Sequence, residues 1–336
     1  MNNIIDKFNR PIKDLRISVM DTCNYRCPYC MPADKFDENY QFLKSNERLN
    51  FDEICHIVKI FAEFGVNKIR LTGGEPLLRK NLPELISRLK NIDGIKDIAL
   101  TTNGQLLKKQ LPSLIDAGLD RVNISLDTID QNLYRKMSGN KGQLMPVLEA
   151  IDFALSSKLK SVKLNCVVQI GVNDNEILPL LKKYQDTEVV VRFIEFMDVG
   201  TKNDWQKNSV MHFKDILQHI EAKWPLRAVD PNYKGEVASR YKYRDHAGEI
   251  GFITSISKPF CRDCSRARLS ADGKLYTCLF AHEAFDLKTY LRNNNVTSLK
   301  DYIENVWKNR EDRYSEIRHK SKDNNTNRIE MYVIGG

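Results

Sequence analysis

The sequence predicts an α/β fold: a partial, open TIM-like (βα)6 barrel followed by a C-terminal α+β extension. Three observations support this prediction. Short β-rich runs alternate with helical patterns over residues 15–197, six such runs are present, and the texture of the sequence changes after residue 225. Alternating strands and helices form parallel βα units, and six units fall short of the eight in a closed barrel. A doubly wound open sheet is the alternative, because the pattern does not reveal strand order.

The expected strands are the six β-rich runs Leu15–Met20, Lys68–Thr72, Asp97–Thr101, Arg121–Ser125, Val162–Gln169 and Val189–Met197. Helices are expected between them. In the first, Ile54 and Phe61 belong to one apolar face, and Gly65 is placed to end the helix. Further helical signals are Asn81 with Pro83 before Gly94, Leu114 with Ile115 before Gly118, and Leu148, Ile151 and Leu155.

We expect two domains, a barrel over residues 1–225 and a C-terminal domain over residues 226–336. Within the second, Arg266–Leu279 predicts a hairpin, because Asp272-Gly273 is a strong two-residue turn signal. The other C-terminal signals are helical stretches near residues 284–292 and 298–309 and the polar segment 321–328, which is expected to be mobile in isolation.

Composition excludes several classes of protein. The chain has 336 residues, of which 42% are apolar and 29% charged, so it is neither disordered nor collagen-like. No apolar run approaches the roughly 20 residues of a membrane span, and the N-terminus lacks the pattern of a signal peptide. Eight cysteines are too few for a disulfide scaffold. We therefore expect a cytoplasmic protein that does not engage a membrane.

Cys23, Cys27 and Cys30 form a C-x3-C-x2-C run just after the first expected strand. Three thiolates on one tight loop suit a cubane iron–sulfur cluster, for which thiolates are the usual ligands. Three protein ligands leave one iron open to an exogenous ligand, which favours chemistry at the metal. A zinc knuckle or three buried thiols is the alternative, but zinc needs a fourth ligand and none is adjacent.

A second triplet, Cys261, Cys264 and Cys278, lies in the C-terminal part. The expected hairpin returns Cys278 toward the other two, so three thiols again meet. Structural zinc is the alternative here, because His282 follows Cys278 by four residues and would complete a Cys3His site. If His282 is not a ligand, the three cysteines again leave one coordination position of the metal centre open.

Polar residues recur where the expected strands end. Gly73-Gly74-Glu75-Pro76 follows the second strand, and Thr101, Ser125 and Met197 lie at the ends of later ones. Active-site residues of a parallel barrel lie at the C-terminal ends of its strands. Adjacent glycines also let the backbone approach a ligand closely. For Ser125 or Met197 in isolation, filling of the barrel interior is the ordinary alternative.

Basic residues lie on or beside several expected strands. Because a buried cation without an anion is costly, they indicate a polyanionic ligand such as a triphosphate. The net charge, 52 − 44 = +8, agrees with this, and without a recognisable RNA- or DNA-binding motif we expect no nucleic-acid partner. The residues concerned are Arg16, Lys68, Arg70, Lys163, Arg192, Arg266 and Arg268.

The first cysteine loop resembles the signature of the radical S-adenosylmethionine (SAM) superfamily, with Tyr29 at its aromatic position. Gly73–Pro76 resembles the superfamily's GGEP motif, which receives the amino group of SAM. The resemblance implies a radical SAM barrel in which the open iron of a [4Fe–4S] cluster chelates SAM. It also implies that the reduced cluster cleaves SAM to a 5′-deoxyadenosyl radical.

Both cysteine triplets, Arg266-Ala-Arg268 and the terminal Gly335-Gly336 together resemble the GTP 3′,8-cyclase family of molybdenum cofactor biosynthesis. This resemblance implies a lyase that converts GTP to (8S)-3′,8-cyclo-7,8-dihydroguanosine 5′-triphosphate, in which the radical abstracts H3′ and C3′ attacks C8. It implies a second [4Fe–4S] cluster whose open iron binds guanine, and a C-terminal tail that reaches toward the active site. Met20-Asp21-Thr22 stands where the family often has Thr-Asp-Arg.

The resemblance also assigns site residues, none of them as an acid, base or nucleophile. The cluster ligands are Cys23, Cys27 and Cys30 for the first cluster and Cys261, Cys264 and Cys278 for the second. The SAM-binding residues are Tyr29, Gly74, Ser125 and Met197. The GTP-binding residues are Arg16, Lys68, Arg70, Thr101, Lys163, Arg192, Arg266 and Arg268.

The implied partners are an electron donor and cyclic pyranopterin monophosphate synthase, which receives the product, and a homodimer is compatible with the resemblance. Three other hypotheses stay open. The first is another two-cluster radical SAM enzyme such as a peptide-modifying maturase, although those enzymes usually carry more C-terminal cysteines. The others are a non-catalytic iron–sulfur electron carrier and a zinc-stapled nucleic-acid-binding module.

Overall fold

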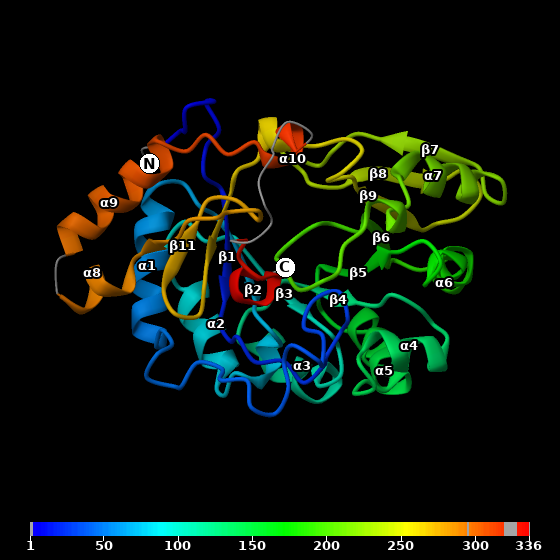
Figure 1. Cartoon of the computed structure of the whole chain (residues 1–336), viewed down its shortest axis with the longest axis horizontal. Helices are drawn as coiled ribbons and strands as arrows, with labels where there is room; N and C mark the ends of the chain where they lie inside the picture. Colours follow the sequence, from blue (N-terminus) through cyan, green and yellow to red (C-terminus); the bar gives the residue numbers. More distant parts are fainter. Residues whose placement is uncertain (1–2, 294–295, 319–327, 336) are drawn as a thin grey trace.

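The computed structural model describes residues 3–293, 296–318 and 328–335, and within these ranges twelve strands form one sheet (Figure 1). The strands are β1 (Asp14–Ser18), β2 (Lys68–Thr72), β3 (Asp97–Thr102), β4 (Arg121–Ser125), β5 (Ser161–Val168), β6 (Val190–Glu195), β7 (Leu226–Val229), β8 (Ser239–Tyr243), β9 (Glu249–Ile253), β10 (Arg266–Leu269), β11 (Lys274–Tyr276) and β12 (Phe285–Asp286). Their order across the sheet is β12-β11-β10-β1-β2-β3-β4-β5-β6-β9-β8-β7.

The six strands expected from the sequence are β1 to β6, and their limits differ from expectation by at most two residues. They pair in parallel and in chain order. Each helical connection therefore leads to the neighbouring strand, always toward the same side of the sheet. A doubly wound sheet would reverse this direction partway along the chain, so that alternative is wrong. The partial, open barrel is confirmed.

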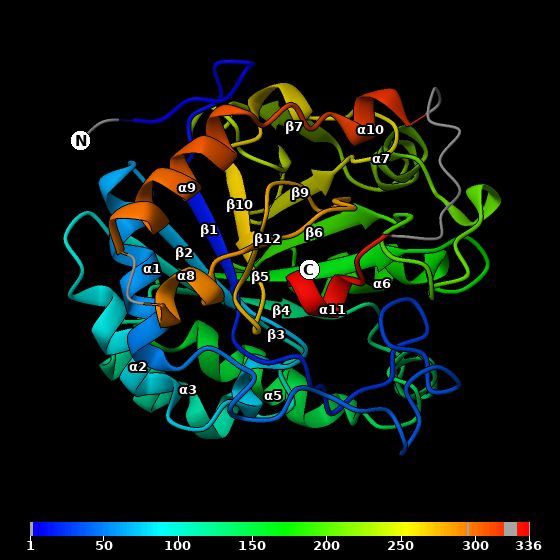
Figure 2. The same cartoon turned by 60° about the vertical axis from the view of Figure 1, so that its left-hand side comes forward.

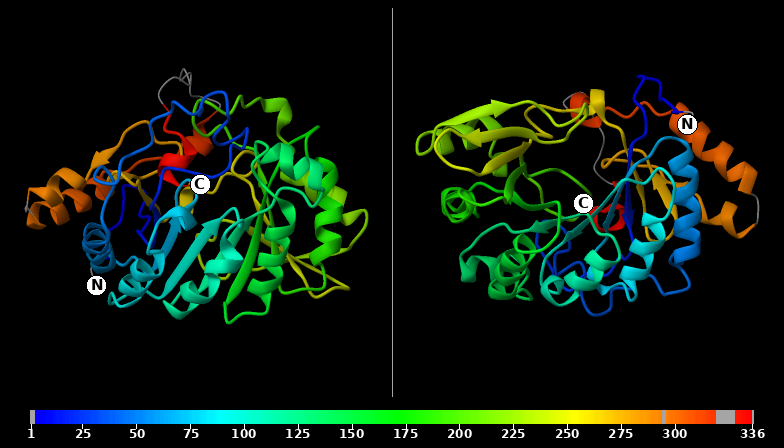
Figure 3. Two further views of the ribbon diagram at one scale, coloured as in Figure 1. Left: turned by 90° about the horizontal axis from the view of Figure 1, so that it is seen from below. Right: turned by 180° about the vertical axis from the view of Figure 1, so that it is seen from behind.

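Helices cover the outer, convex side of the curved sheet (Figures 1 and 3). The helices of the barrel are α1 (Phe51–Glu63), α2 (Leu82–Lys90), α3 (Leu107–Asp116), α4 (Gln131–Met137), α5 (Leu144–Leu155) and α6 (Ile177–Tyr184). The later helices are α7 (Phe213–Glu221), α8 (Lys288–Arg292), α9 (Val296–Lys308), α10 (Tyr314–Ile317) and α11 (Met331–Ile334). Short 3-10 turns are η1 (Pro76–Leu78), η2 (Asp174–Glu176), η3 (Lys207–Ser209) and η4 (Cys261–Asp263).

Helix α1 shows why these segments are helical. The Asn50 side chain accepts a hydrogen bond from the Glu53 amide, and the Glu53 carboxylate accepts one from the Asn50 amide, each at 2.8 Å. This reciprocal cap satisfies two amides that a helix start leaves unpaired. Ile54 and Phe61 are buried in the main core, and burial of such a side chain contributes about 1.5–3 kcal/mol. Gly65, with φ of 100°, ends the helix as expected.

The C-terminal part of the chain extends both edges of the six-stranded sheet. β9 pairs in parallel with β6, and β10 pairs in parallel with β1 (Figure 2). Neither pairing was expected from the sequence. The predicted hairpin is confirmed, because β10 and β11 pair antiparallel and Gly273 in the turn has φ of 84°.

Two other expectations concern the C-terminal region. The predicted domain boundary at residue 225 lies just before β7 and stays a prediction. Residues 321–327 of the polar segment lie outside the described residues, whereas Arg328 is described and buried. No described helix is long and apolar enough to cross a bilayer.

Candidate active site

Both cysteine triplets line one cavity of about 300 Å³. Strands β1 to β6 and β8 to β10 contribute to its wall, whereas the edge strands β12 and β7 do not. Every predicted site residue lines it except Lys68. The predicted residues brought together there are Cys23, Cys27, Cys30, Cys261, Cys264, Cys278, Tyr29, Gly74, Ser125, Met197, Arg16, Arg70, Thr101, Lys163, Arg192, Arg266 and Arg268.

Lys68 is the exception because it lies at the start of β2, at the end of the strand remote from Gly73. Its Nζ atom lies 3.2 Å from the ring centroid of Tyr233. Tyr233 itself lines the cavity, so Lys68 is one residue removed from it. Tyr233 was not among the residues predicted from the sequence; it lies in the connection between β7 and β8.

The first cysteine loop packs directly on the end of β2. The Gly74 amide donates to the Met20 carbonyl at 2.6 Å, and the Glu75 amide donates to the Thr22 carbonyl at 2.9 Å. A Cβ atom on Gly73 or Gly74 would lie 2.2 or 2.3 Å from those same carbonyl oxygens. The glycine pair is therefore required by close approach of two backbones, in addition to any approach of a ligand.

Two buried carboxylates tie together the strand ends around the first triplet. Glu75 accepts hydrogen bonds from the Thr102 hydroxyl at 2.7 Å and from the Asn103 amide at 2.8 Å, and burial raises its pKa to about 7. Asp127 accepts from the Tyr29 hydroxyl at 2.6 Å, and burial raises its pKa to about 6. These contacts fix Tyr29 and the ends of β3 and β4 around one end of the cavity.

In the second triplet, Cys261 begins η4, Cys264 directly follows it, and Cys278 lies two residues after β11. The Cys264 sulfur accepts hydrogen bonds from Arg266 Nη2 at 3.2 Å and Arg310 Nη2 at 3.3 Å. Burial would raise the pKa of the Cys264 thiol, but the two guanidinium groups lower it to about 6. Burial raises the pKa of Cys278 to about 12. Arg310 carries no sequence signal, because it is 46 residues from Cys264 in the chain.

The donor sets fit iron–sulfur clusters better than zinc. Among the described residues, no group of three or more His, Cys, Asp or Glu side chains could hold a single metal ion. His282 is exposed and does not line the cavity, so the Cys3His alternative lacks its fourth ligand. All eight cysteines are free thiols. Triplets of free thiols that face one cavity match the ligand type of a cluster, which is larger than a single ion.

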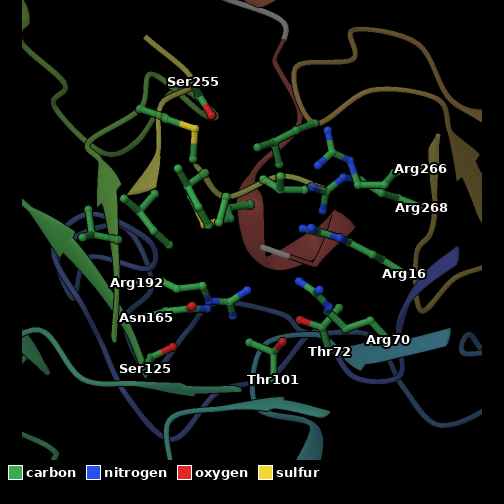
Figure 4. Close-up of a pocket in the computed structure, with 18 of the residues that line it drawn as sticks. Arg16, Arg70, Thr72, Thr101, Ser125, Asn165, Arg192, Ser255, Arg266 and Arg268 are labelled. Carbon is green, nitrogen blue, oxygen red and sulfur yellow. The ribbon is translucent and has the colours of Figure 1, made fainter. Parts of the chain in front are cut away.

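A group of cations fills the other end of the cavity. The register across β10, β1 and β2 aligns Arg268, Arg16 and Arg70 as neighbours in one row. Arg192 enters from β6, where its Nη2 donates to Asn123 Oδ1 at 2.7 Å. Figure 4 shows that converging guanidinium groups point into the same space; they belong to Arg16, Arg70, Arg192, Arg266 and Arg268.

These cations lack sufficient counter-charge. Burial, followed by repulsion from neighbouring arginines, lowers the pKa of Arg192 to about 9 and that of Arg16 well below its usual value. The same two causes lower the pKa of Lys163 to about 8. The Nε atoms of Arg16, Arg70 and Arg192 have no hydrogen-bond partner among the described residues. Because buried, unpaired cations are costly, the arrangement favours a polyanionic ligand.

Two cavity residues not identified from the sequence add further polar groups to its wall. Asn165 is the register partner of Arg192, and its side-chain oxygen has no hydrogen-bond partner among the described residues. Asp14, at the start of β1, lines the cavity near Arg70 and Arg16. Neither residue belongs to a motif, so only the strand register could have revealed them.

The C-terminal segment also reaches the cavity, as expected. Met331 and Tyr332 of α11 line it, and Arg268 Nη1 donates to the carbonyl oxygens of Ile334, at 3.2 Å, and Gly335. A Cβ atom on Gly335 would lie 2.2 Å from Thr72 Cγ2, so the backbone packs against the end of β2. The other terminal residue of the expected tail, 336, lies outside the described residues.

Two family models match the chain. The Radical SAM superfamily model covers residues 17–184, and the Molybdenum Cofactor Synthesis C model covers residues 189–316. Together they include both cysteine triplets and all the cations that line the cavity except Arg16, which lies one residue before the first match.

Curated relatives match over almost their whole length. A protein of Xanthomonas axonopodis pv. citri (strain 306) is 49% identical over 331 residues, which is 98% of each chain. A protein of Staphylococcus aureus (strain bovine RF122 / ET3-1) is 47% identical over 340 residues, which is 100% of each chain. Both relatives are named GTP 3′,8-cyclase.

One solved structure shares the fold. The crystal structure of Streptococcus suis SuiB bound to S-adenosylmethionine superposes with a TM-score of 0.62 at 15% sequence identity. The match covers 93% of this chain and 69% of that one. At this identity the likeness concerns the fold alone.

Proposed function

The chain belongs to the GTP 3′,8-cyclase family of radical SAM enzymes, and from this premise we propose how its cavity holds cofactor and substrate. The enzyme acts in the first step of molybdenum cofactor biosynthesis, with GTP as its substrate. A radical SAM enzyme carries a [4Fe–4S] cluster and SAM. The assignment of individual residues to these groups is our proposal.

The end of the cavity at the first cysteine loop is the proposed SAM site. Cys23, Cys27 and Cys30 would hold the first cluster, and three thiolate ligands leave one iron for SAM. The SAM contacts would come from Tyr29, Gly74, Ser125 and Met197. The hydrogen bond from Tyr29 to Asp127 supports this assignment, because it fixes the tyrosine ring. The close packing of the Gly74 backbone on the first cysteine loop also supports it.

The cationic end is the proposed nucleotide site. Cys261, Cys264 and Cys278 would hold a second [4Fe–4S] cluster whose open iron meets the guanine base. The triphosphate would supply the negative charge that the cations lack, and each charge-assisted hydrogen bond is worth about 1.5–3 kcal/mol. The nucleotide ligands in this proposal are Arg16, Lys68, Arg70, Thr101, Lys163, Arg192, Arg266 and Arg268.

When bound, the first cluster and SAM would supply a radical that takes H3′ from GTP; the C3′ radical would then bond to C8, and one electron from the external donor and one proton would complete the 7,8-dihydro product. The chain's own residues bind and orient the two molecules. The cations fix the nucleotide in one pose, and the buried wall of the cavity excludes water from the reacting carbon. No side chain needs to act as a nucleophile in this scheme.

The observation that carries the proposal is the opening of both cysteine triplets and the cation group onto one cavity. The test is anaerobic reconstitution, analysis of iron, sulfide and zinc, and incubation with GTP, SAM and a reductant. We expect iron and sulfide for two clusters, together with 5′-deoxyadenosine and the cyclised nucleotide. One cluster, or zinc in the C-terminal part, would contradict the second site. Deoxyadenosine formed without consumption of GTP would favour a peptide-modifying enzyme instead.

We further propose that an external donor reduces the clusters and that the product passes to cyclic pyranopterin monophosphate synthase. We place the enzyme in the cytoplasm, as predicted, because clusters with an open iron need a reducing compartment. Cell fractionation tests the location, and light scattering tests whether the enzyme forms a homodimer.

A further inference from the structure

The loop that follows β6, residues 197–201, contacts two parts of the molecule. Met197 lines the cavity, whereas the rest of the loop packs against the last described segment, residues 328–335, which we call the tail. The loop is held independently of the tail: Asn203 Nδ2 donates to the Met197 carbonyl at 3.1 Å, and Trp205 Nε1 donates to the Phe196 carbonyl at 2.9 Å. The loop is therefore a fixed support.

Asp198 is the main attachment point for the tail. Its buried carboxylate accepts hydrogen bonds from Arg328 Nη1 at 2.8 Å and from the Tyr314 hydroxyl at 2.6 Å. The Asp198 backbone carbonyl accepts a further bond from Arg328 Nη1 at 2.7 Å. Arg318 Nη2 lies 3.0 Å from the other carboxylate oxygen. One carboxylate thus gathers two arginines and a tyrosine.

A second contact fixes the direction of the tail. The Thr201 amide and hydroxyl donate to Glu330 Oε1 at 2.9 and 2.8 Å. Gly200 has φ of 76°, and a Cβ atom there would lie 2.3 Å from Glu330 Oε2. The loop therefore meets the tail closely at two successive residues, and the positive φ of Gly200 together with its close approach to the Glu330 carboxylate disfavours a side chain there.

The far end of the tail reaches the nucleotide end of the cavity. The hydroxyl groups of Tyr332 and Tyr40 lie 2.5 Å apart and hold α11 against the loop after the first triplet. Beyond α11, the carbonyl oxygens of Ile334 and Gly335 accept hydrogen bonds from Arg268. A continuous chain of contacts thus runs from Asp198 through the tail to a cation of the nucleotide site.

We propose that Asp198 is a positioning residue: it anchors the tail on the loop after β6, and the anchored tail orients Arg268 toward the nucleotide. Asp198 touches neither ligand in this scheme, because it acts through Arg328 and the tail carbonyls. The role of Arg268 rests on the proposed function, whereas anchoring of the tail does not.

The test compares Asp198→Asn with Asp120→Asn in the reconstituted full-length enzyme. Asp120 is a matched control, because it is also a buried carboxylate with two cationic partners, but those partners, Lys90 and Lys160, do not belong to the tail. Hydrogen exchange measured by mass spectrometry reports the tail directly. We expect exchange over residues 328–335 to be roughly tenfold or more faster in Asp198→Asn only, since a charge-assisted bond is lost.

Kinetic measurements distinguish loss of tail anchoring from a general loss of folded enzyme. In Asp198→Asn we expect kcat/KM for GTP to fall roughly tenfold or more, while GTP-independent cleavage of SAM stays unchanged. Arg328→Met, made from the tail side, should give the same pattern. The double variant should lose no more than the worse single variant, because both changes break one contact.

Unchanged tail exchange in both single variants would overturn the proposal, as would a released tail with unaltered GTP kinetics. Additive losses in the double variant would also contradict it. If Asp198→Asn fails to fold, Arg328→Met carries both measurements. If the wild type turns over no GTP, the proposed function fails, and the exchange experiment still decides whether Asp198 anchors the tail.

Discussion

The two ends of the cavity use the same number of cysteines in opposite electrostatic settings. Around the first triplet the nearby ionisable groups include the carboxylates Glu75 and Asp127, and burial raises the pKa of Cys23 to about 11. Around the second triplet, Arg266 and Arg310 donate directly to the Cys264 sulfur. SAM carries a positive sulfonium and GTP a polyanionic triphosphate. The surroundings of each triplet, rather than its ligand count, therefore support the proposed assignment of SAM to the first triplet and GTP to the second.

The largest difference between the two ends is expected when one triplet is removed at a time. Cys23→Ser with Cys27→Ser and Cys30→Ser should abolish all detectable formation of 5′-deoxyadenosine, because SAM loses its iron. The same change at Cys261, Cys264 and Cys278 should leave SAM cleavage measurable and abolish cyclisation of GTP. Chromatography of both products from anaerobic reactions provides the measurement.

Cys55→Ser is the control for these variants, because Cys55 is a buried free thiol outside both triplets. It should retain both activities. If the second set of variants also lost SAM cleavage, the two ends would not be separable and the comparison would fail.

Removal of a cation at the nucleotide end should have the next largest effect. Arg16→Met should weaken GTP binding by roughly 10- to 150-fold, the equivalent of about 1.5–3 kcal/mol. It should also raise the free energy of unfolding of the empty enzyme, because burial and repulsion by Arg70 destabilise the Arg16 cation. Isothermal titration and denaturant unfolding measure the two effects.

Arg121→Met is the matched control for Arg16→Met. Arg121 also lines the cavity, but its guanidinium is paired with Asp97 at 2.7–3.0 Å. Its removal should lower the free energy of unfolding, the opposite sign to Arg16→Met. A stability loss in both variants would mean that the cation group is already balanced without an anion.

The pH dependence of GTP binding sharpens the comparison further. Burial and the Arg192 charge lower the pKa of Lys163 from 10.5 to about 8, so the free enzyme loses this proton as the pH rises through 8. A bound triphosphate favours the charged form, so GTP affinity should be full below pH 8 and fall above it, by roughly tenfold. Binding titrations between pH 7 and 9 measure this.

Lys163→Met should bind GTP more weakly and show no such dependence between pH 7 and 9. Lys163→Arg should keep its charge above pH 8 and retain affinity there. An unchanged profile in Lys163→Met would assign the transition to another group.

The smallest expected effect concerns the sulfur environment of the second triplet. Arg310→Met removes a cationic donor to Cys264, so the second cluster should become harder to reduce and its potential should fall relative to the first. Each tenfold loss in stabilisation of the reduced form corresponds to about 59 mV for one electron. Redox titration followed by EPR measures the shift, with Arg310→Lys as a variant that keeps the charge. Equal shifts at both clusters would contradict the assignment.

Local patterns were sufficient to predict β1 to β6 and the hairpin of β10 and β11, because strand periodicity and turn chemistry lie within a few residues. The row formed by Arg268, Arg16 and Arg70 was different. It depends on parallel pairing of β10 with β1, which joins residues about 250 positions apart in the chain. No local signal encodes such a pairing.

The predicted site shows the same division. Cysteines and glycines with fixed spacing identified both triplets and the approach at Gly74, whereas Arg310, Asn165 and Tyr233 became visible only through tertiary packing. Lys68 was predicted by resemblance, yet its ammonium lies over the Tyr233 ring at the edge of the cavity. The roles of all the site residues stay predictions until they are tested as above.

The placement of β9 and β10 has a consequence for solubility. In the six-stranded sheet alone, β1 and β6 would be exposed edge strands. β10 pairs with β1 and β9 pairs with β6, so both are covered. A chain stopped at residue 225 would present two rows of unpaired amide and carbonyl groups, the template on which sheets of neighbouring molecules add to one another. The C-terminal part therefore also serves as a guard against aggregation, and the barrel half alone should precipitate even where its own core is intact.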